Sequence, residues 1–369
     1  MLFRQVSDFI EEQIGSGEIP EGMRIPTVSA LREKFRVSHV TVLRAFRELL
    51  GRGVIVKKGK CYVAAPPRKG NGPESFTGTV CALFRTVVPY TKIDNYTNDI
   101  ICGIYRECLQ NGFALFTPPQ AFSLSTIGMW QKKRKMLSPE LLRGALDANR
   151  FCDGFLFDER VPDDVIRQIL DATGKPGVLI DRHAPDLPLD AAVPANRQAM
   201  KIACETAWRY GYRRFLYIKR SKPTWNSAER DAAFQEFSAE RLKNDDWACV
   251  SDWTTLAEEV VVSALYKAFD KLRGPGKPVA VIASFDRFCQ SLLELFTARG
   301  AVLCRDYGLC GVGGMSSEEQ TPPLLTAVRA DASGIGQLAV RQLLKRISGS
   351  RAPFAAFSPE PLLFCGETL

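Results

Sequence analysis

The sequence predicts an α/β protein of two parts, a small N-terminal head followed by a larger region of parallel β-sheet. Three observations lead to this class. Near the N-terminus, apolar residues recur at three- and four-residue steps, which is typical of short amphipathic helices. A stretch rich in proline and glycine follows at 64–73. From Thr79 on, short runs of Val, Ile, Leu and Phe alternate with longer helical segments, as in buried parallel sheets. We place the head at 1–66, a linker at 67–77 and the α/β region at 78–369.

Length and charge agree with this division. The chain has 369 residues, more than one ordinary domain holds. Residues 1–70 contain thirteen Lys or Arg and seven Asp or Glu, whereas the remainder contains 36 and 34. A cationic head suits the release of counterions from nucleic-acid phosphates. No apolar run is long enough to span a bilayer and no signal peptide opens the chain, so we expect a cytoplasmic protein without a membrane partner.

The cysteines and histidines argue against a metal centre. Eleven cysteines occur singly, without a Cys-x-x-Cys pair, and the only histidines are His39 and His183. The sequence therefore predicts reduced, mostly buried thiols, no zinc site and no cofactor.

The head is predicted to contain three helices and a hairpin. A first helix is expected at about 3–14 and a shorter one over 26–35. A third helix begins after Ser38, whose hydroxyl suits an N-cap. Residues 53–63 have the pattern of a strand, a basic turn and a strand. Two helices, a turn and a basic hairpin make a winged helix-turn-helix.

The third helix is predicted to enter the major groove of DNA. One face of this helix is expected to be an apolar stripe that consists of Val37, Val40, Leu43, Phe46 and Leu50. The groove side would carry short polar and cationic groups suited to base edges and phosphates. The expected DNA-contacting residues are Thr27, Ser38, His39, Thr41, Arg44, Arg47, Lys58 and Lys60. The alternative is a helical head that binds a protein partner.

Over about residues 2–66 the chain resembles the head of the GntR family of bacterial regulators. The matching residues are Ile25-Pro26-Thr27, Leu31, Val37-Ser38, Thr41-Val42, Ala45, Leu49, Gly53-Val54-Ile55, Gly59 and Tyr62-Val63. His39 and Leu43 stand where the family usually has basic residues, and the wing lacks one residue of the usual Gly-x-Gly turn. The resemblance implies that a homodimer binds a double-stranded DNA operator.

The larger region is predicted to form two sheets, because it contains too many strand–helix units for one. The expected strands are 79–84, 114–116, 154–157, 177–180, 215–218, 248–250, 279–283 and 308–312. The expected helices are 98–110, 139–148, 163–172, 197–210, 228–243, 255–272, 288–299 and 333–347. Ligands of such folds bind beyond the carboxyl ends of the strands.

The residues that follow these strands mix carboxylates, guanidinium groups and aromatic rings. Such groups bind the hydroxyls and the apolar faces of sugars. A Ser/His/Asp arrangement is not indicated, since only His183 could act as a base in this region. The glycines at 311–314 lack the Gly-Lys-Ser/Thr ending of a phosphate loop. We therefore do not expect an enzyme.

Residues 78–369 resemble the effector-binding part of the LacI/GalR regulators, which is itself similar to periplasmic sugar-binding proteins. The resemblance lies in 178–182, 210–214, 227–234, 278–286 and 323–328. It implies that Arg230 and Asp286 hold ligand hydroxyls, that Trp253 stacks on the ligand and that Tyr90 and Asp94 close the pocket. The expected ligand-binding residues are Tyr90, Asp94, Asp181, Trp225, Arg230, Trp253 and Asp286. Gly313-Gly314-Met315 replaces the Phe-Asp-Asp usual in that family.

The segment at 123–138 is longer than the corresponding segment expected from the resemblance to the LacI/GalR regulators. Residues 123–138 contain Lys132-Lys133-Arg134-Lys135. We expect a solvated loop or helix face there, and the alternative is a second contact with nucleic acid.

These observations predict a transcriptional regulator, by default a repressor, whose operator binding is modulated by a small sugar. Two alternatives remain open. A regulator of purine or nucleoside metabolism would stack a base on Trp253 or Tyr90. A carbohydrate-acting enzyme could also be fused to a DNA-binding head.

Overall fold

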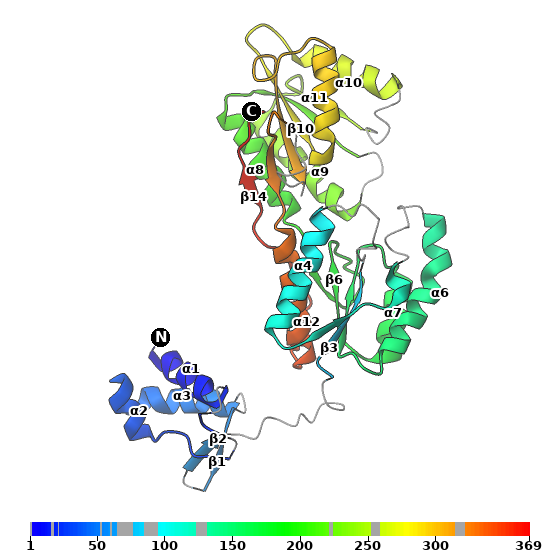
Figure 1. Cartoon of the computed structure of the whole chain (residues 1–369). Helices are drawn as coiled ribbons and strands as arrows, with labels where there is room; N and C mark the ends of the chain where they lie inside the picture. The colour runs from blue at the N-terminus through cyan, green and yellow to red at the C-terminus, as the bar shows by residue number, and fades with distance from the viewer. Residues whose placement is uncertain are drawn as a thin grey trace. The chain divides into compact units, whose positions relative to one another are not determined.

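In a computed structural model the chain divides into two units, Met1–Phe76 and Thr77–Leu369, and each is described by itself (Figure 1). The structure describes residues 2–15, 18–20, 22–51, 54–59, 61–64, 77–84, 95–122, 131–220, 224–251, 259–313 and 322–369. Among these residues, none of the helices has the length and apolar character needed to cross a membrane.

The first unit is a winged helix-turn-helix, as the sequence predicts. Its helices are α1 (Leu2–Gly15), α2 (Val28–Phe35) and α3 (His39–Gly51), and its wing is the antiparallel pair β1 (Ile55–Lys58) and β2 (Cys61–Ala64). Lys58 pairs with Cys61, and Gly59 in the turn has φ +65°, a conformation that glycine adopts without strain. Val6, Ile10 and Leu31 pack with one face of α3 to form the core of the head.

Local hydrogen bonds fix the turn between α2 and α3. Thr27 Oγ1 accepts from the backbone N of Ala30 at 3.2 Å and caps α2. Arg36 ends α2 in the left-handed region at φ 51°. Ser38 Oγ accepts from the backbone N of Thr41 at 3.2 Å, which confirms the predicted cap of α3.

The first subdomain of the second unit is built on a six-stranded, all-parallel sheet. Its strand order is β13-β7-β6-β5-β3-β4. The strands are β3 (Thr79–Leu83), β4 (Ala114–Phe116), β5 (Gly154–Phe157), β6 (Gly177–Ile180), β7 (Asp190–Ala192) and β13 (Ala356–Phe357). Helices α6 (Gln131–Ala148) and α7 (Asp163–Thr173) cover one face, and α4 (Asn95–Gln110) and α12 (Ala332–Ile347) cover the other. The short 3₁₀ helix η1 (Pro119–Phe122) follows β4.

Two glycines let α4 and α12 approach closely. A Cβ at Gly103 would lie 2.0 Å from the backbone oxygen of Ser333, and one at Gly336 would lie 2.1 Å from that of Ile100. Because the neighbours are backbone atoms, a side chain at either position would force the helices apart. The two helices lie side by side in Figure 1.

The second subdomain has a six-stranded sheet of order β14-β12-β11-β10-β8-β9, parallel except for β14. The strands are β8 (Arg214–Ile218), β9 (Trp247–Val250), β10 (Val279–Ala283), β11 (Tyr307–Gly313), β12 (Thr326–Arg329) and β14 (Leu362–Phe364). Helices α8 (Asn196–Arg209) and α9 (Trp225–Arg241) cover one face. Helices α10 (Glu259–Leu272) and α11 (Cys289–Ala298) cover the other, and the 3₁₀ helix η3 (Asp286–Phe288) precedes α11.

The chain passes between the two subdomains three times. After β7 it enters the second subdomain, after β12 it returns as α12, and after β13 it crosses again to β14. Arg346 of α12 fixes the returning segment with a bidentate ion pair to Asp190, at 2.7 and 2.9 Å. Asp190 also accepts from the backbone N of Ala355 at 3.0 Å. The subdomains are thus joined by three connections.

The predicted two-sheet architecture is confirmed, with specific differences. The sequence prediction omitted β7, β12, β13 and β14, which have two to four residues each. Helix α6 begins at Gln131 and not at 139, so Pro139 lies inside the helix and the cationic run at 132–135 lies on a helix. Residues 123–130 are outside the described residues. So are 252–258, where the start of α10 was predicted.

Candidate functional site

The buried face of α3 differs from the predicted stripe. Its buried residues are Val42, Ala45, Phe46 and Leu49, all at most 2% exposed, whereas Val40 is 68% exposed. The predicted stripe is therefore confirmed for Val37 and Phe46, and Leu50 packs partly buried against the same core. It is wrong for Val40, and Leu43 is half-buried. Both sets have helical spacing, and packing against α1 selects the set that contains Ala45. As a result, an apolar side chain faces solvent on the helix predicted to read DNA.

The predicted DNA-contacting residues are mostly exposed. His39, Arg44, Arg47 and Ser38 are exposed on or next to α3, Thr41 is half-buried, Thr27 is exposed at α2 and Lys58 is exposed at the wing. Two of them have local partners in addition. Ser38 Oγ lies 2.8 Å from Thr41 Oγ1, and the Arg44 guanidinium lies 4.3 Å from the centroid of the Phe3 ring. Lys60 lies outside the described residues.

In the second unit, Asp181 directly follows β6 and is 5% exposed. Its φ of +63° belongs to the left-handed region, which Asp tolerates better than most residues. Its Oδ1 accepts from Tyr96 Oη at 2.8 Å and from Asn226 Nδ2 at 3.1 Å. Burial, followed by the charge of Asp181, raises the pKa of Tyr96 well above its usual value. The phenol therefore stays protonated and remains a donor to the carboxylate.

Arg230 lies on α9, is 6% exposed and donates to three neutral acceptors. Nε donates to Asn196 Oδ1 at 2.7 Å, and Nη1 donates to the backbone oxygens of Ser284 and Val312 at 2.6 and 3.1 Å. These backbone oxygens lie at the carboxyl ends of β10 and β11, so Arg230 holds two neighbouring strand ends in register. Burial lowers the pKa of its guanidinium.

Two asparagines connect Asp181 with Arg230. Asn226 Nδ2 donates to Asp181, while Asn226 Oδ1 accepts from Asn196 Nδ2 at 2.7 Å. Asn196 Oδ1 then accepts from Arg230. Tyr96 and Asp181 belong to the first subdomain, and the other three residues belong to helices of the second. We call this buried series of five residues the inter-subdomain network.

Asp286 begins η3 after β10 and is 4% exposed. Glycines of β11 make room for it: a Cβ at Gly313 would lie 2.1 Å from Asp286 Oδ1, and one at Gly311 would lie 2.7 Å from its Cα. Arg329 pairs with Gly313 across β11 and β12. The spacing of Gly311 and Gly313 therefore admits this carboxylate next to the strand ends.

The other predicted ligand residues are placed in part. Trp225 follows the N-cap Thr224 of α9 and is half-buried against the core of the first subdomain. It contacts His183 edge-on, with ring centroids 6.2 Å apart. Tyr90, Asp94 and Trp253 lie outside the described residues.

Sequence reasoning missed Tyr96, Asn196 and Asn226. One signal was available for Asn226, because it precedes Arg230 by four residues and so shares a face of α9 with it. No comparable signal pointed to Asn196, which meets Arg230 across 34 residues of sequence. Within the described part of the chain, His, Cys, Asp and Glu side chains form no group that could hold a metal ion.

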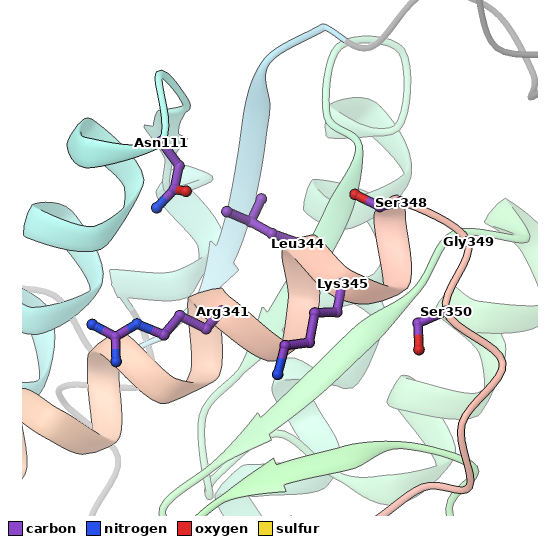
Figure 2. A pocket seen from close by; sticks show the side chains of 7 residues that line it. All are labelled: Asn111, Arg341, Leu344, Lys345, Ser348, Gly349 and Ser350. Atoms are coloured by element: carbon purple, nitrogen blue, oxygen red, sulfur yellow. The ribbon is translucent and has the colours of Figure 1, made fainter. Parts of the chain in front are cut away.

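A separate open pocket lies at the C-terminal end of α12 (Figure 2). It is lined by Asn111, Arg341, Leu344, Lys345, Ser348, Gly349 and Ser350. Arg341 forms a bidentate ion pair with Glu107 of α4, with both contacts at 2.9 Å. The guanidinium group of Arg341 therefore has a partner within the first subdomain. None of the residues that line this pocket belongs to the inter-subdomain network.

Comparison with known proteins assigns both units. Residues 2–60 match the family model of bacterial regulatory proteins of the gntR family, and residues 204–368 match that of a periplasmic binding protein-like domain. The mannosyl-D-glycerate transport/metabolism system repressor MngR of Escherichia coli is 46% identical over 54 residues, 15% of this chain and 22% of that protein. The HTH-type transcriptional regulator KdgR of Bacillus subtilis is 24% identical over 251 residues, 68% of this chain and 69% of that protein.

Solved structures share the fold at lower identity. A complex of the transcriptional regulator CelR with cellobiose has a TM-score of 0.60 at 19% identity, covering 90% of this chain and 92% of that one. A probable maltose operon repressor MalR of Staphylococcus aureus has a TM-score of 0.62 at 16% identity, covering 80% and 99%. The chain therefore matches a gntR-family head over residues 2–60 and a periplasmic binding protein-like domain over residues 204–368, and the solved structures share its fold.

Proposed function

We propose that the protein is a transcriptional regulator, acting as a repressor, whose operator binding is modulated by a small sugar held between the two subdomains. The inter-subdomain network carries this proposal. It joins the end of β6 in one subdomain to the ends of β10 and β11 in the other, which is where ligands of parallel α/β folds bind. Asp181, Arg230 and Asp286 all lie there, each at most 6% exposed.

The network also supports a mechanism for regulation. A ligand that hydrogen-bonds to Asp181 or Arg230 changes the contacts that hold the subdomains relative to each other. In a homodimer, such a change would alter the separation of the two heads and hence their fit to paired half-sites. Ligand and DNA would then affect each other's affinity reciprocally, by about 1–3 kcal/mol if the coupling is typical.

The sugar assignment draws on the similar proteins. CelR was solved as a cellobiose complex, and a LacI family regulator of Enterococcus faecium with TM-score 0.58 was solved with bound ribose. The polar groups at the strand ends suit ligand hydroxyls in the same way. Trp225 offers an aromatic edge beside them, and Tyr90, Asp94 and Trp253 remain part of the proposed site by resemblance. In this proposal the protein acts in the cytoplasm, where it binds a double-stranded DNA operator, and it does not catalyse a reaction.

The proposed DNA surface consists of the exposed side of α3 and the wing. Thr27, Ser38, His39, Thr41, Arg44, Arg47, Lys58 and Lys60 are proposed to contact DNA. The exposed Arg47 and Lys58 are suited to phosphates, whereas His39 and Thr41 lie at the start of α3, where helix-turn-helix proteins contact bases.

The test combines two measurements on the full chain. Selection from random duplexes should give an operator, and thermal unfolding against a panel of sugars and nucleosides should identify a ligand. A ligand at a hundred times its dissociation constant stabilises the native state by about 2.7 kcal/mol. A sugar that raises the midpoint and weakens operator binding would support the proposal. A nucleoside with these effects would replace the sugar, and turnover of a sugar would establish the enzyme alternative.

A further inference from the structure

Three arginines gather at the carboxyl ends of the second sheet. Arg220 follows β8, Arg230 lies on α9 and Arg329 ends β12. Burial is the main influence on the pKa of each of the three, and it lowers all of them. Among the described residues, none of the three has a carboxylate oxygen within 4.0 Å. Arg230 is buried, and Arg220 and Arg329 are half-buried. Removing a guanidinium from water without a counterion is costly, so this arrangement favours an anion.

Phe285 brings two of these arginines together. It lies between Ser284 and Asp286, directly after β10. The guanidinium carbon of Arg220 lies 5.1 Å from the centroid of the Phe285 ring, and that of Arg230 lies 4.8 Å from it. An aromatic ring attracts a cation but offers no strong hydrogen-bond acceptor. The Phe285 ring therefore does not supply the hydrogen-bond acceptor that the buried Nε of Arg220 lacks among the described residues.

Several buried polar atoms in this region have no hydrogen-bond partner among the described residues. They are Ser284 Oγ, Arg220 Nε, and Nε and Nη2 of Arg329. Ser284 is 1% exposed, and both of its backbone groups are used: its N donates to the Ile218 oxygen and its O accepts from Arg230. Its hydroxyl is therefore a buried group that a ligand could satisfy, and leaving it unsatisfied is costly.

These donors distinguish an acidic ligand from a neutral one. A sugar hydroxyl brings a donor together with its acceptor sites, whereas a carboxylate or phosphate oxygen brings acceptors alone and a negative charge. A guanidinium and a hydroxyl are both able to donate to such an oxyanion. The opposite charges that act at longer range are Glu159 toward Arg220, Asp286 toward Arg329, and both Asp286 and Asp181 toward Arg230.

We propose that the effector is a sugar that carries an oxyanion, either a carboxylate or a phosphate, and that Arg220 and Ser284 bind this group beside Phe285. Arg329, whose charge interacts with that of Asp286, adds positive charge at the same sheet end. The inference rests on the proposed function, because it specifies the class of sugar bound at the same strand ends.

The first experiment compares ligands that share a carbon skeleton. Isothermal titration of the full chain uses D-glucose, D-glucuronate and D-glucose 6-phosphate, and the same three forms of galactose and mannose. We expect an acidic member to bind at least about tenfold more tightly than its neutral parent, which corresponds to one charge-assisted hydrogen bond. The pH dependence separates the two sources of charge. Binding of a phosphate strengthens as its second proton is lost near about pH 6, whereas binding of a carboxylate stays level there.

The second experiment changes the protein. Arg220→Met and Ser284→Ala should each weaken binding of the acidic sugar by about tenfold to a hundredfold. Ser284→Ala should leave the thermal midpoint of the unliganded protein unchanged or raised, since it removes a buried hydroxyl without a partner. Arg305→Met is the matched control, because Arg305 precedes β11 and so lies at the amino ends of the strands of the same sheet. Its side chain is 68% exposed. It should leave binding unchanged.

The outcomes separate this inference from the proposed function. A neutral sugar that binds as tightly as its acidic forms, with no effect of Arg220→Met, would overturn the oxyanion and leave the sugar regulator standing. If no neutral, carboxylate or phosphate form binds and no sugar alters operator binding, both the oxyanion inference and the proposed sugar regulation are overturned.

Discussion

Asn226 donates from one amide nitrogen to two oxygens of Asp181, although the two residues lie 45 positions apart in the sequence. Its Nδ2 is 2.9 Å from the backbone oxygen of Asp181 and 3.1 Å from Oδ1. Asn226 lies in the first turn of α9 in the second subdomain, and Asp181 directly follows β6 in the first. This contact therefore fixes the position of one subdomain relative to the other at the proposed effector site.

Replacing Asn226 should loosen the two subdomains. Asn226→Ala removes a donor to Asp181 and the acceptor of Asn196 Nδ2, so buried polar groups lose their partners. We expect a loss of about 1–3 kcal/mol in the free energy of unfolding of the second unit. All five tryptophans lie in that unit, so urea unfolding followed by tryptophan fluorescence reports on it separately from the head. Asn244→Ala, at an exposed turn position of the same subdomain, is the control. An unchanged midpoint for Asn226→Ala would show that the contact contributes nothing.

The close packing of α4 and α12 gives a second prediction. Alanine has a higher helix propensity than glycine by about 1 kcal/mol, so Gly336→Ala would be stabilising on propensity alone. Its Cβ would instead lie 2.1 Å from the backbone oxygen of Ile100. We expect a net destabilisation of about 1–3 kcal/mol, measured by the same urea unfolding.

Gly144→Ala is the matched control for this substitution. Gly144 is also a buried glycine within a helix, α6, but a Cβ there would meet side-chain atoms and not backbone, with Gln120 Oε1 at 2.6 Å and Pro118 Cβ at 3.2 Å. Its stability should change by less than about 1 kcal/mol, because the propensity gain offsets the repacking. Equal effects of the two substitutions would contradict the role of backbone contact.

The contrast between short-range and long-range features explains how far the sequence could predict the fold. Strands such as 154–157, 177–180 and 279–283 were predicted with their observed bounds, because each is a continuous apolar run buried on both faces. Strand β7 has three residues and pairs with β6, and β13 has two residues and forms where the chain returns after α12 to pair with β7. No local pattern reports such a pairing.

The same contrast holds for the site. Asp181, Arg230 and Asp286 were predicted because each follows a strand end or matches a motif. Asn196 and Asn226 were missed, since an asparagine becomes part of a network only through partners that are distant in sequence. The stripe on α3 was partly misplaced because two sets of residues share helical spacing, and only the packing of α1 decides between them. Roles in binding ligand or DNA remain predictions for all of these residues.

The ion pair of Glu107 and Arg341 predicts a dependence of stability on pH. Hydrogen bonding to Arg341 is the main cause of the lowered pKa of Glu107. A carboxylate with a lowered pKa stabilises the native state above its unfolded pKa, near about 4.3, and this contribution is lost as the pH falls through the folded value. Arg341→Met should therefore destabilise the second unit by about 1 kcal/mol at neutral pH, with a difference that shrinks below about pH 4.

Urea midpoints across this pH range test the ion pair. Glu107→Gln supplies the control, because it removes the titrating group. In that background the effect of Arg341→Met should no longer vary with pH. A difference between wild type and Arg341→Met that stays constant from neutral to acid pH would show that the pair makes no linked contribution.

The exposed Val40 leads to a prediction about DNA reading. It is 68% exposed on α3, and Arg44 and Arg47 follow it at the four- and seven-residue steps that place all three on one side of the helix. An apolar side chain in the major groove contacts the methyl group of thymine. We expect Val40→Ala to weaken binding to a selected operator by about 1 kcal/mol, close to the value of one buried methyl contact, and to leave binding to random duplex unchanged.

Two comparisons make this prediction specific. Replacing thymine by uracil at each operator position in turn removes one methyl group, and at the contacted position it should weaken the wild type but not Val40→Ala. Lys58→Ala at the wing should instead weaken operator and random duplex alike and reduce the salt slope by about 0.9, because a phosphate contact carries no sequence information. If no uracil substitution affects the wild type, Val40 does not read thymine, and its exposure has another cause.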